Sequence, residues 1–222
     1  MPVTNGRSCL RSCNRPFTIN INPGLSNMPT LVLGLAVFFG LHLVPAMPSL
    51  RARLRDAMGP GLYKLGFSLI SVVAIVLIAR GYRSAHWLGD GNTELWSLPT
   101  MLRPLTTLLM LPAFILLAAA YIPSRIRTAA KHPMLAGITL WALAHLLVRG
   151  DLASVLLFGG FLAFGLLDRI SADRREARGP LGKAQGGVRG DIAAVAVGSV
   201  AFADMVLWLH GAAFGVPLTP TH

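Results

Sequence analysis

Four histidines lie within or at the ends of long apolar stretches of the chain, and they are the residues best suited to do chemistry. They are His42, His132, His145 and His210. An ionisable group at membrane depth is costly, and it usually faces a partner, a cofactor or the interior of a helical bundle. A neutral imidazole is also a common axial ligand of haem iron. We therefore expect a cofactor role within this set. The alternatives are an interhelical hydrogen bond for His42 and a position at the membrane interface for His132 and His210.

The spacing of His132 and His145 limits what the two can share. They are thirteen residues apart in one apolar stretch, and a straight helix places them about 20 Å apart. One iron cannot bind both, so a second ligand must come from another helix. His42 is offset in depth from each of them by roughly 10 Å on the same helix geometry, and spacing alone does not choose its partner.

Asp204 is the only carboxylate that interrupts an apolar stretch. Its expected depth is similar to that of His145, whose second ring nitrogen it can orient, as outer carboxylates do for ligating histidines. The alternatives are that Asp204 caps a break in the last helix or pairs with Arg149 or Arg103. The sequence assigns no catalytic residue.

The composition indicates a membrane protein, because 54% of the 222 residues are hydrophobic and only 13% are charged. A bilayer crossing needs roughly 20 apolar residues, and backbone groups in lipid must be satisfied within each segment. The sequence therefore predicts an all-α fold, a polytopic transmembrane bundle of about six helices. The first, third and last uncharged stretches are long enough to cross easily, and the others rely on flanking charges that reach the headgroups. The stretches are 16–50, 65–79, 104–124, 132–148, 152–167 and 192–222, the last interrupted by Asp204.

Connections rich in basic residues alternate with connections that contain few of them. The connections after the first, third and fifth stretches carry thirteen Lys and Arg residues, and the other side carries four. The positive-inside rule then predicts that the rich connections are cytoplasmic and that both termini face outward. This distribution explains the net charge of +11 better than nucleic-acid binding does, so the expected partner is the lipid bilayer. Phosphate-binding loops and hydrolase or metalloprotease motifs are absent from the sequence.

Two parts are expected along the chain. Residues 1–27, with Cys9 and Cys13, are interpreted as a disordered extension or a mis-assigned start, and residues 28–215 as the transmembrane domain. A signal peptide cleaved near Ala46 is the rival interpretation of the first apolar stretch. Only Arg149, Gly150 and Asp151 separate the fourth and fifth stretches, which predicts a tight antiparallel hairpin. Small residues from Gly159 to Gly165 predict close helix packing there.

A family resemblance follows from several short motifs in a common order. The motifs are Lys131-His132-Pro133-Met134, Gly137, Trp141 and Leu143-Ala144-His145, together with His42 before Ser49-Leu50-Arg51, Tyr63-Lys64, Leu95-Trp96 and Asp173-Arg174-Arg175. The chain from Met28 to the last apolar stretch resembles the NnrU family and its relative, the plastid 15-cis-zeta-carotene isomerase.

The resemblance implies haem b held by two histidines at the positions of His42 and His145, with His132 as a third important histidine. The isomerase acts on a cis double bond of a polyene without net oxidation, whereas NnrU-type proteins are associated with denitrification. We expect a haem-binding NnrU-type protein of the bacterial inner (plasma) membrane that supports nitric oxide or nitrite metabolism. The alternatives are a haem-dependent cis-trans isomerase with a hydrophobic small-molecule substrate and a non-catalytic scaffold. The chain departs from the isomerase in Leu43-Val44-Pro45, where that enzyme has a small polar run.

Overall fold

The computed structural model describes residues 27–88, 92–97, 101, 103–175 and 186–214. Regular structure in these ranges is helical, apart from one isolated bridge between Glu94 and Asp151, and the predicted all-α fold is confirmed. The helices are α1 (Asn27–Leu43), η1 (Val44–Ala46), α2 (Pro48–Leu88), α3 (Arg103–Ala119), α4 (Arg125–Ala130), α5 (Pro133–Leu146), α6 (Leu152–Ser154), α7 (Gly160–Arg174), α8 (Val188–Asp204) and α9 (His210–Phe214). Two π-helical turns, η3 (Val155–Gly159) and η4 (Met205–Leu209), join α6 to α7 and α8 to α9.

Six of the helical segments in the described ranges are apolar, and four are long enough to cross a membrane. The four are Met28–Ala46, Pro48–His86, Leu152–Arg174 and Val188–Ala212, and the shorter two are Pro104–Ala119 and Pro133–Leu146. The expectation that stretch 104–124 is long enough to cross easily is wrong. Its helix ends at Ala119, where the chain turns, and Pro123 precedes α4. Stretch 65–79 instead belongs to the longest helix, since the basic residues on both sides of it are also helical.

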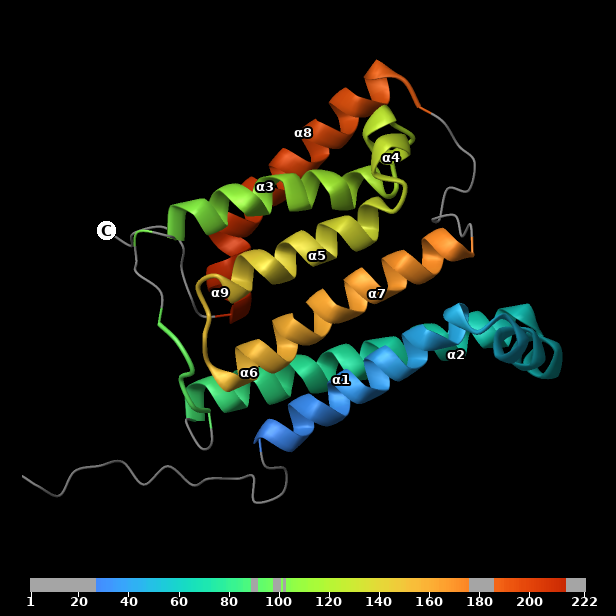
Figure 1. Ribbon diagram of the computed structural model, residues 1–222, viewed down its shortest axis with the longest axis horizontal. Helices are drawn as coiled ribbons and strands as arrows, with labels where there is room; N and C mark the ends of the chain where they lie inside the picture. The colour runs from blue at the N-terminus through green and yellow to red at the C-terminus, as the bar shows by residue number, and fades with distance from the viewer. Residues whose placement is uncertain (1–26, 89–91, 98–100, 102, 176–185, 215–222) are drawn as a thin grey trace, which may run out of the picture.

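The helices lie side by side rather than around a central axis (Figure 1). Helix α8 packs on α3, α3 on α5 and α5 on α7, while α1 and α2 pair with each other and lie next to α7. The order in space therefore differs from the order along the chain. Helix α7 stands between α1, which carries His42, and α5, which carries His145.

Small residues set the spacing between neighbouring helices. A Cβ at Gly81 of α2 would lie 2.7 Å from Cα of Leu31 in α1, and one at Gly198 of α8 would lie 2.6 Å from Cα of Ile115 in α3. One at Gly165 of α7 would lie 2.6 Å from Oγ1 of Thr139. The predicted close packing of the fifth stretch is confirmed at Gly165, since a small residue lets a neighbouring helix approach closely.

The two ends of the helix row differ in charge. We call the end formed by residues 44–64, 121–132, 169–175 and 186–190 the basic end, because most Lys and Arg residues lie there. The opposite end is formed by residues 82–88, 92–97 and 145–154, and it contains the predicted hairpin between α5 and α6. Predictions for residues 1–26, for the connection at 176–185 and for the final residues 215–222 lie outside the described ranges.

Candidate functional site

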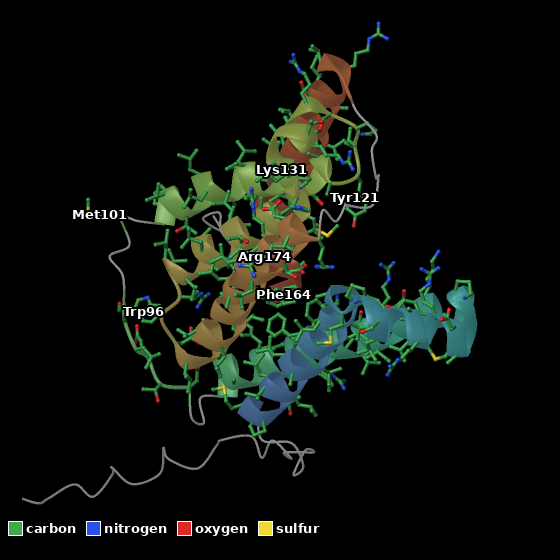
Figure 2. The ribbon with its side chains drawn as sticks, turned by 45° about the vertical axis from the view of Figure 1, so that its right-hand side comes forward. Trp96, Met101, Tyr121, Lys131, Phe164 and Arg174 are labelled. Carbon is green, nitrogen blue, oxygen red and sulfur yellow. The ribbon has the colours of Figure 1, made fainter. Side chains whose placement is uncertain are left out.

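His42 lies in the last turn of α1, and its ring is held in one orientation. Nδ1 is 2.8 Å from the main-chain oxygen of Phe38, four residues earlier. The imidazole stacks on the Phe38 ring at 4.0 Å and meets the Phe67 and Phe164 rings at 5.1 and 6.2 Å. Figure 2 shows Phe164 on α7, between that helix and α1. The surroundings of this imidazole are apolar and aromatic, as expected for a site at membrane depth.

His145 repeats this arrangement in the last turn of α5. Its Nδ1 is 2.9 Å from the main-chain oxygen of Trp141, again four residues earlier. The imidazole stacks on Phe158 at 4.6 Å, and the Trp141 ring lies 5.3 Å away. Phe158 belongs to the π-helical turn η3, a local widening that is frequent at functional sites.

The two hydrogen bonds define which ring nitrogen is available. A carbonyl oxygen only accepts, so Nδ1 of His42 and of His145 must each carry the proton. Nε2 then has a free lone pair, and neither Nε2 has a hydrogen-bond partner among the described residues. Metal-ligating histidines typically have this geometry, with one nitrogen bound to a carbonyl and the other directed at the metal. Both residues therefore have the donor chemistry of a haem ligand.

A chain of aromatic contacts separates the two imidazoles. It runs from His42 to Phe38 at 4.0 Å, from Phe38 to Phe161 at 5.3 Å, from Phe161 to Trp141 at 5.6 Å and from Trp141 to His145 at 5.3 Å. These rings pack against the buried hydrophobic core. The structure thus brings both histidines to one aromatic cluster on three helices, but it does not bring their Nε2 atoms together. In the described ranges, no three His, Cys, Asp or Glu residues are grouped to hold a metal ion.

His132 lies at the other end of α5 from His145, and it makes a polar contact instead. Its Nε2 is 3.2 Å from Oδ1 of Asp173 near the end of α7, and its side chain is only 9% exposed. Two residues later, Arg175 donates from Nη1 to the main-chain oxygen of Pro45 at 2.9 Å and from Nη2 to Oδ1 of Asp168 at 3.2 Å. Asp173 and Arg175 therefore connect the end of α7 to α5 and to the residues that follow α1.

Asp204 does not orient His145 in this structure, because the main-chain oxygen of Trp141 occupies Nδ1. Asp204 is half-buried at the end of α8, and it forms no hydrogen bond with a described residue. The chain does not break there, since Asp204 keeps helical angles and leads into η4. His210, directly after η4, lies close enough to His145 to interact with it electrostatically. The sequence interpretation did not connect these two residues.

A polar network at the opposite end is a further feature that the sequence did not indicate. Ser154 donates to Oδ2 of Asp151 at 2.6 Å, and it therefore accepts from the Tyr82 hydroxyl at 2.9 Å. The amide of Asn92 donates to Oδ1 of Asp151 at 3.0 Å. Beside them, Arg149 donates from Nη1 to Nε2 of His86 at 3.2 Å. Its contacts join residues 82–92 to residues 149–154 across 59 to 72 positions of the chain, so no short motif reveals the network.

Asp151 gives this network a pH dependence. Burial raises the pKa of its carboxyl, but hydrogen bonds from Ser154 and Asn92 outweigh that effect and hold the pKa below the usual 3.8. A group with a lowered folded-state pKa stabilises the fold above its unfolded pKa, and the contribution is lost as the pH falls through the folded value. We expect wild type to lose thermal stability in detergent below about pH 4 more steeply than Asp151→Asn. Glu94→Gln, an exposed neighbour, is the control, and parallel profiles for wild type and Asp151→Asn would contradict this account.

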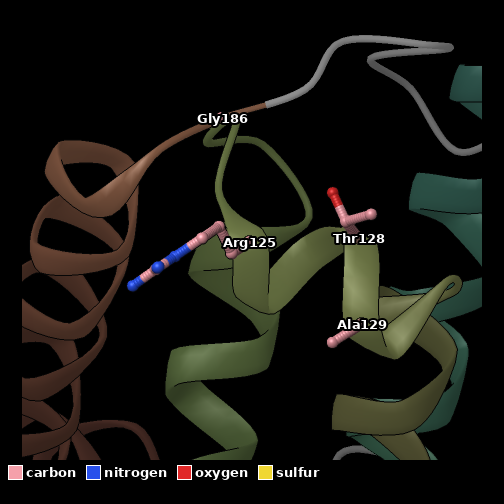
Figure 3. Close-up of a pocket in the computed structure, with 4 residues that line it drawn as sticks. All are labelled: Arg125, Thr128, Ala129 and Gly186. Atoms are coloured by element: carbon pink, nitrogen blue, oxygen red, sulfur yellow. The ribbon is translucent and has the colours of Figure 1, made fainter.

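A shallow pocket in the described ranges lies away from these histidines. It is an open hollow at the basic end, lined by Arg125, Thr128, Ala129 and Gly186 (Figure 3). The Arg125 guanidinium is paired with Asp191 at 2.6 Å. The hollow therefore has no uncompensated charge from Arg125 to attract an anion, and none of the predicted site residues lines it.

The fold and the site together define a helical membrane protein with histidines among its apolar helices. The family model described as NnrU protein matches residues 30–218. Since the match covers most of the chain, the protein belongs to the NnrU family. Searches among curated proteins and among solved structures return no match.

Proposed function

We propose that this NnrU-family protein binds haem b through His42 and His145 in the bacterial inner membrane and supports nitric oxide or nitrite metabolism. The observation that carries the haem part is the matched geometry of the two imidazoles. Each has Nδ1 bound to the carbonyl four residues earlier, and each leaves Nε2 free within aromatic surroundings. Denitrification is supported by the family resemblance alone. Placing the basic end in the cytoplasm, with both termini outward, follows from the positive-inside rule.

The residues between His42 and His145 determine what haem binding requires of this chain. His42 of α1 and His145 of α5 would hold the haem through their Nε2 atoms, and the haem would supply an iron centre able to bind nitric oxide. Phe38, Phe161 and Trp141 lie between the two imidazoles, and α7 stands between their helices. Binding of one haem by both histidines therefore requires α1 and α5 to shift relative to α7, in addition to rotation of these side chains. These rings then exclude water from the site.

The test is the absorption spectrum of the protein purified in mild detergent. We expect a Soret band for wild type and loss of most of it in His42→Ala and in His145→Ala. His86→Ala is the matched control, because it removes an imidazole that accepts a hydrogen bond from Arg149. Haem that survives in both the His42 and His145 variants would overturn the ligand pair. A wild-type protein that stays colourless after haem supply would favour the alternative of a non-catalytic membrane scaffold.

A second candidate function is cis-trans isomerisation of a hydrophobic polyene. The observation that favours it is the aromatic cluster itself, since the rings of Phe38, Phe161, Phe164 and Trp141 form a surface suited to a conjugated chain. Co-expression with a di-cis carotene and chromatography of the pigments tests it. A changed isomer ratio that disappears in His145→Ala supports the enzyme, and unchanged ratios in wild type exclude this substrate.

A further inference from the structure

The first part of α2 is a separate helical segment at the basic end. Gly59 has φ 76° and ψ 158°, which are not helical angles, and Pro60 follows it. Proline cannot donate to the preceding turn, and it commonly starts a new helix. Residues 48–58 therefore form a helix of their own, before the long part of α2 that is apolar enough to cross a membrane. Figure 1 shows these first turns at the far end of α2, beyond the ends of α1 and α7.

This segment has almost no cover from the rest of the protein. All of residues 48–58 are exposed except Leu54, which is half-buried. Leu50 and Met58 are 39% and 42% exposed. Helices shorter than roughly 12 residues are marginal in water without a packing partner. A helix of this length with so little protein cover needs an external surface that stabilises it.

The side chains of the segment divide into an apolar stripe and its basic borders. At 100° per residue, the positions of Leu50, Leu54, Ala57 and Met58 fall within an arc of about 100°. Arg51 borders the stripe on the Met58 side, and Arg53 borders it on the Ala57 side. Long basic side chains beside an apolar stripe bury their stems in the lipid boundary and place their charges on headgroups.

We propose that residues 48–58 form an interfacial helix that binds the anionic headgroup surface of the bilayer at the basic end. The apolar stripe enters the acyl boundary, and Arg51 and Arg53 contact lipid phosphates. Continuity with the membrane-length part of α2 favours lipid over a protein partner. Only Gly59 separates the two helices. Lys64 lies directly before the uncharged stretch, so the segment that precedes it is close to the membrane surface. The net positive charge of the segment complements anionic lipid, and each arginine strengthens such a contact roughly fivefold.

The test uses the full chain in lipid nanodiscs and hydrogen–deuterium exchange of residues 48–58. One set of nanodiscs contains phosphatidylcholine alone, and the other replaces a third of it with phosphatidylglycerol. We expect stronger protection in the anionic discs and a decrease at high salt. Arg51→Gln combined with Arg53→Gln should return protection to its level in neutral lipid. Arg174→Gln combined with Arg169→Gln, at the same end but outside the segment, is the matched charge control.

A second pair of variants tests the apolar stripe. Leu54→Ser should increase exchange in both kinds of disc, whereas Ala52→Ser, on the other side of the same helix, should not. Exchange in α1 reports whether each variant keeps its fold. Protection that is the same in neutral and anionic discs and unaffected by the arginine substitutions would overturn the proposal, as would equal effects of the two serine variants. The haem spectrum has no part in this test, so it stands apart from the proposed function.

Discussion

Replacing Gly81 with alanine is expected to force α1 and α2 apart and to destabilise the protein by about 2–3 kcal/mol. A Cβ at this position meets the main-chain nitrogen of Leu31 and lies 2.7 Å from its Cα. Leu31 is fully buried, and backbone atoms cannot rotate aside as a flexible side chain can. The chain must relieve the clash by moving one helix, which opens the packing between α1 and α2 around Leu31. Thermal unfolding in detergent measures the loss.

Gly66→Ala is the matched control for this prediction. It adds the same methyl group to the same helix, but nothing lies within 4 Å of its Cβ position. Alanine is favoured over glycine inside a helix, so this variant should gain about 0.5–1 kcal/mol. Equal stability changes in the two variants would show that the close approach of α1 and α2 does not limit stability.

Replacing Arg175 with alanine is expected to loosen the end of α1 and to cost about 1.5–3 kcal/mol, the usual range for a hydrogen bond to a charged group. The main-chain oxygen of Pro45, which Arg175 binds at 2.9 Å, belongs to the turn that follows α1. Carbonyls at a helix end lack partners within the helix. Without Arg175, the Pro45 oxygen loses this donor, and the Asp168 carboxylate loses the hydrogen bond that it accepts from the same side chain. Hydrogen exchange of residues 42–47 should rise.

Arg174→Ala provides the comparison for Arg175→Ala. Arg174 is exposed and forms no hydrogen bond or ion pair with a described residue, and Figure 2 marks its place on α7. Both variants remove one positive charge from the same helix end, so only the contacts differ. Faster exchange near His42 in both variants would point to charge rather than to the Pro45 contact. Unchanged exchange in both would remove this role of Arg175.

The sequence singled out the histidines of the candidate site, but it did not give their arrangement. An imidazole inside an apolar stretch is conspicuous, and the interval of thirteen residues correctly places His132 and His145 at opposite ends of α5. The expected role of Asp204 failed because a main-chain carbonyl one turn earlier reaches Nδ1 of His145. Such local bonds depend on the side-chain rotamer, which composition and spacing do not specify.

The positions of the apolar helices could be predicted from the sequence, but their lengths could not. The uncharged stretches located every apolar segment, because lipid excludes charge. The span predicted at 65–79 lies in a helix of membrane-crossing length, which flanking arginines, good helix formers, extend. Stretch 104–124 gives a shorter helix than expected, because a turn and Pro123 end it. Charge marks where a membrane crossing ends, and backbone hydrogen bonding decides where a helix ends.

From its sequence alone, this protein is determined to be a helical membrane protein of the NnrU type, with its apolar segments and histidines in place. The reason is that hydropathy and motif order are properties of contiguous residues. Only the tertiary structure decides that α7 stands between α1 and α5, and that Phe38, Phe161 and Trp141 lie between His42 and His145. It also decides that Arg175 reaches Pro45. These relations depend on which helices pack together, and such pairing is set by close contacts between residues far apart in the chain.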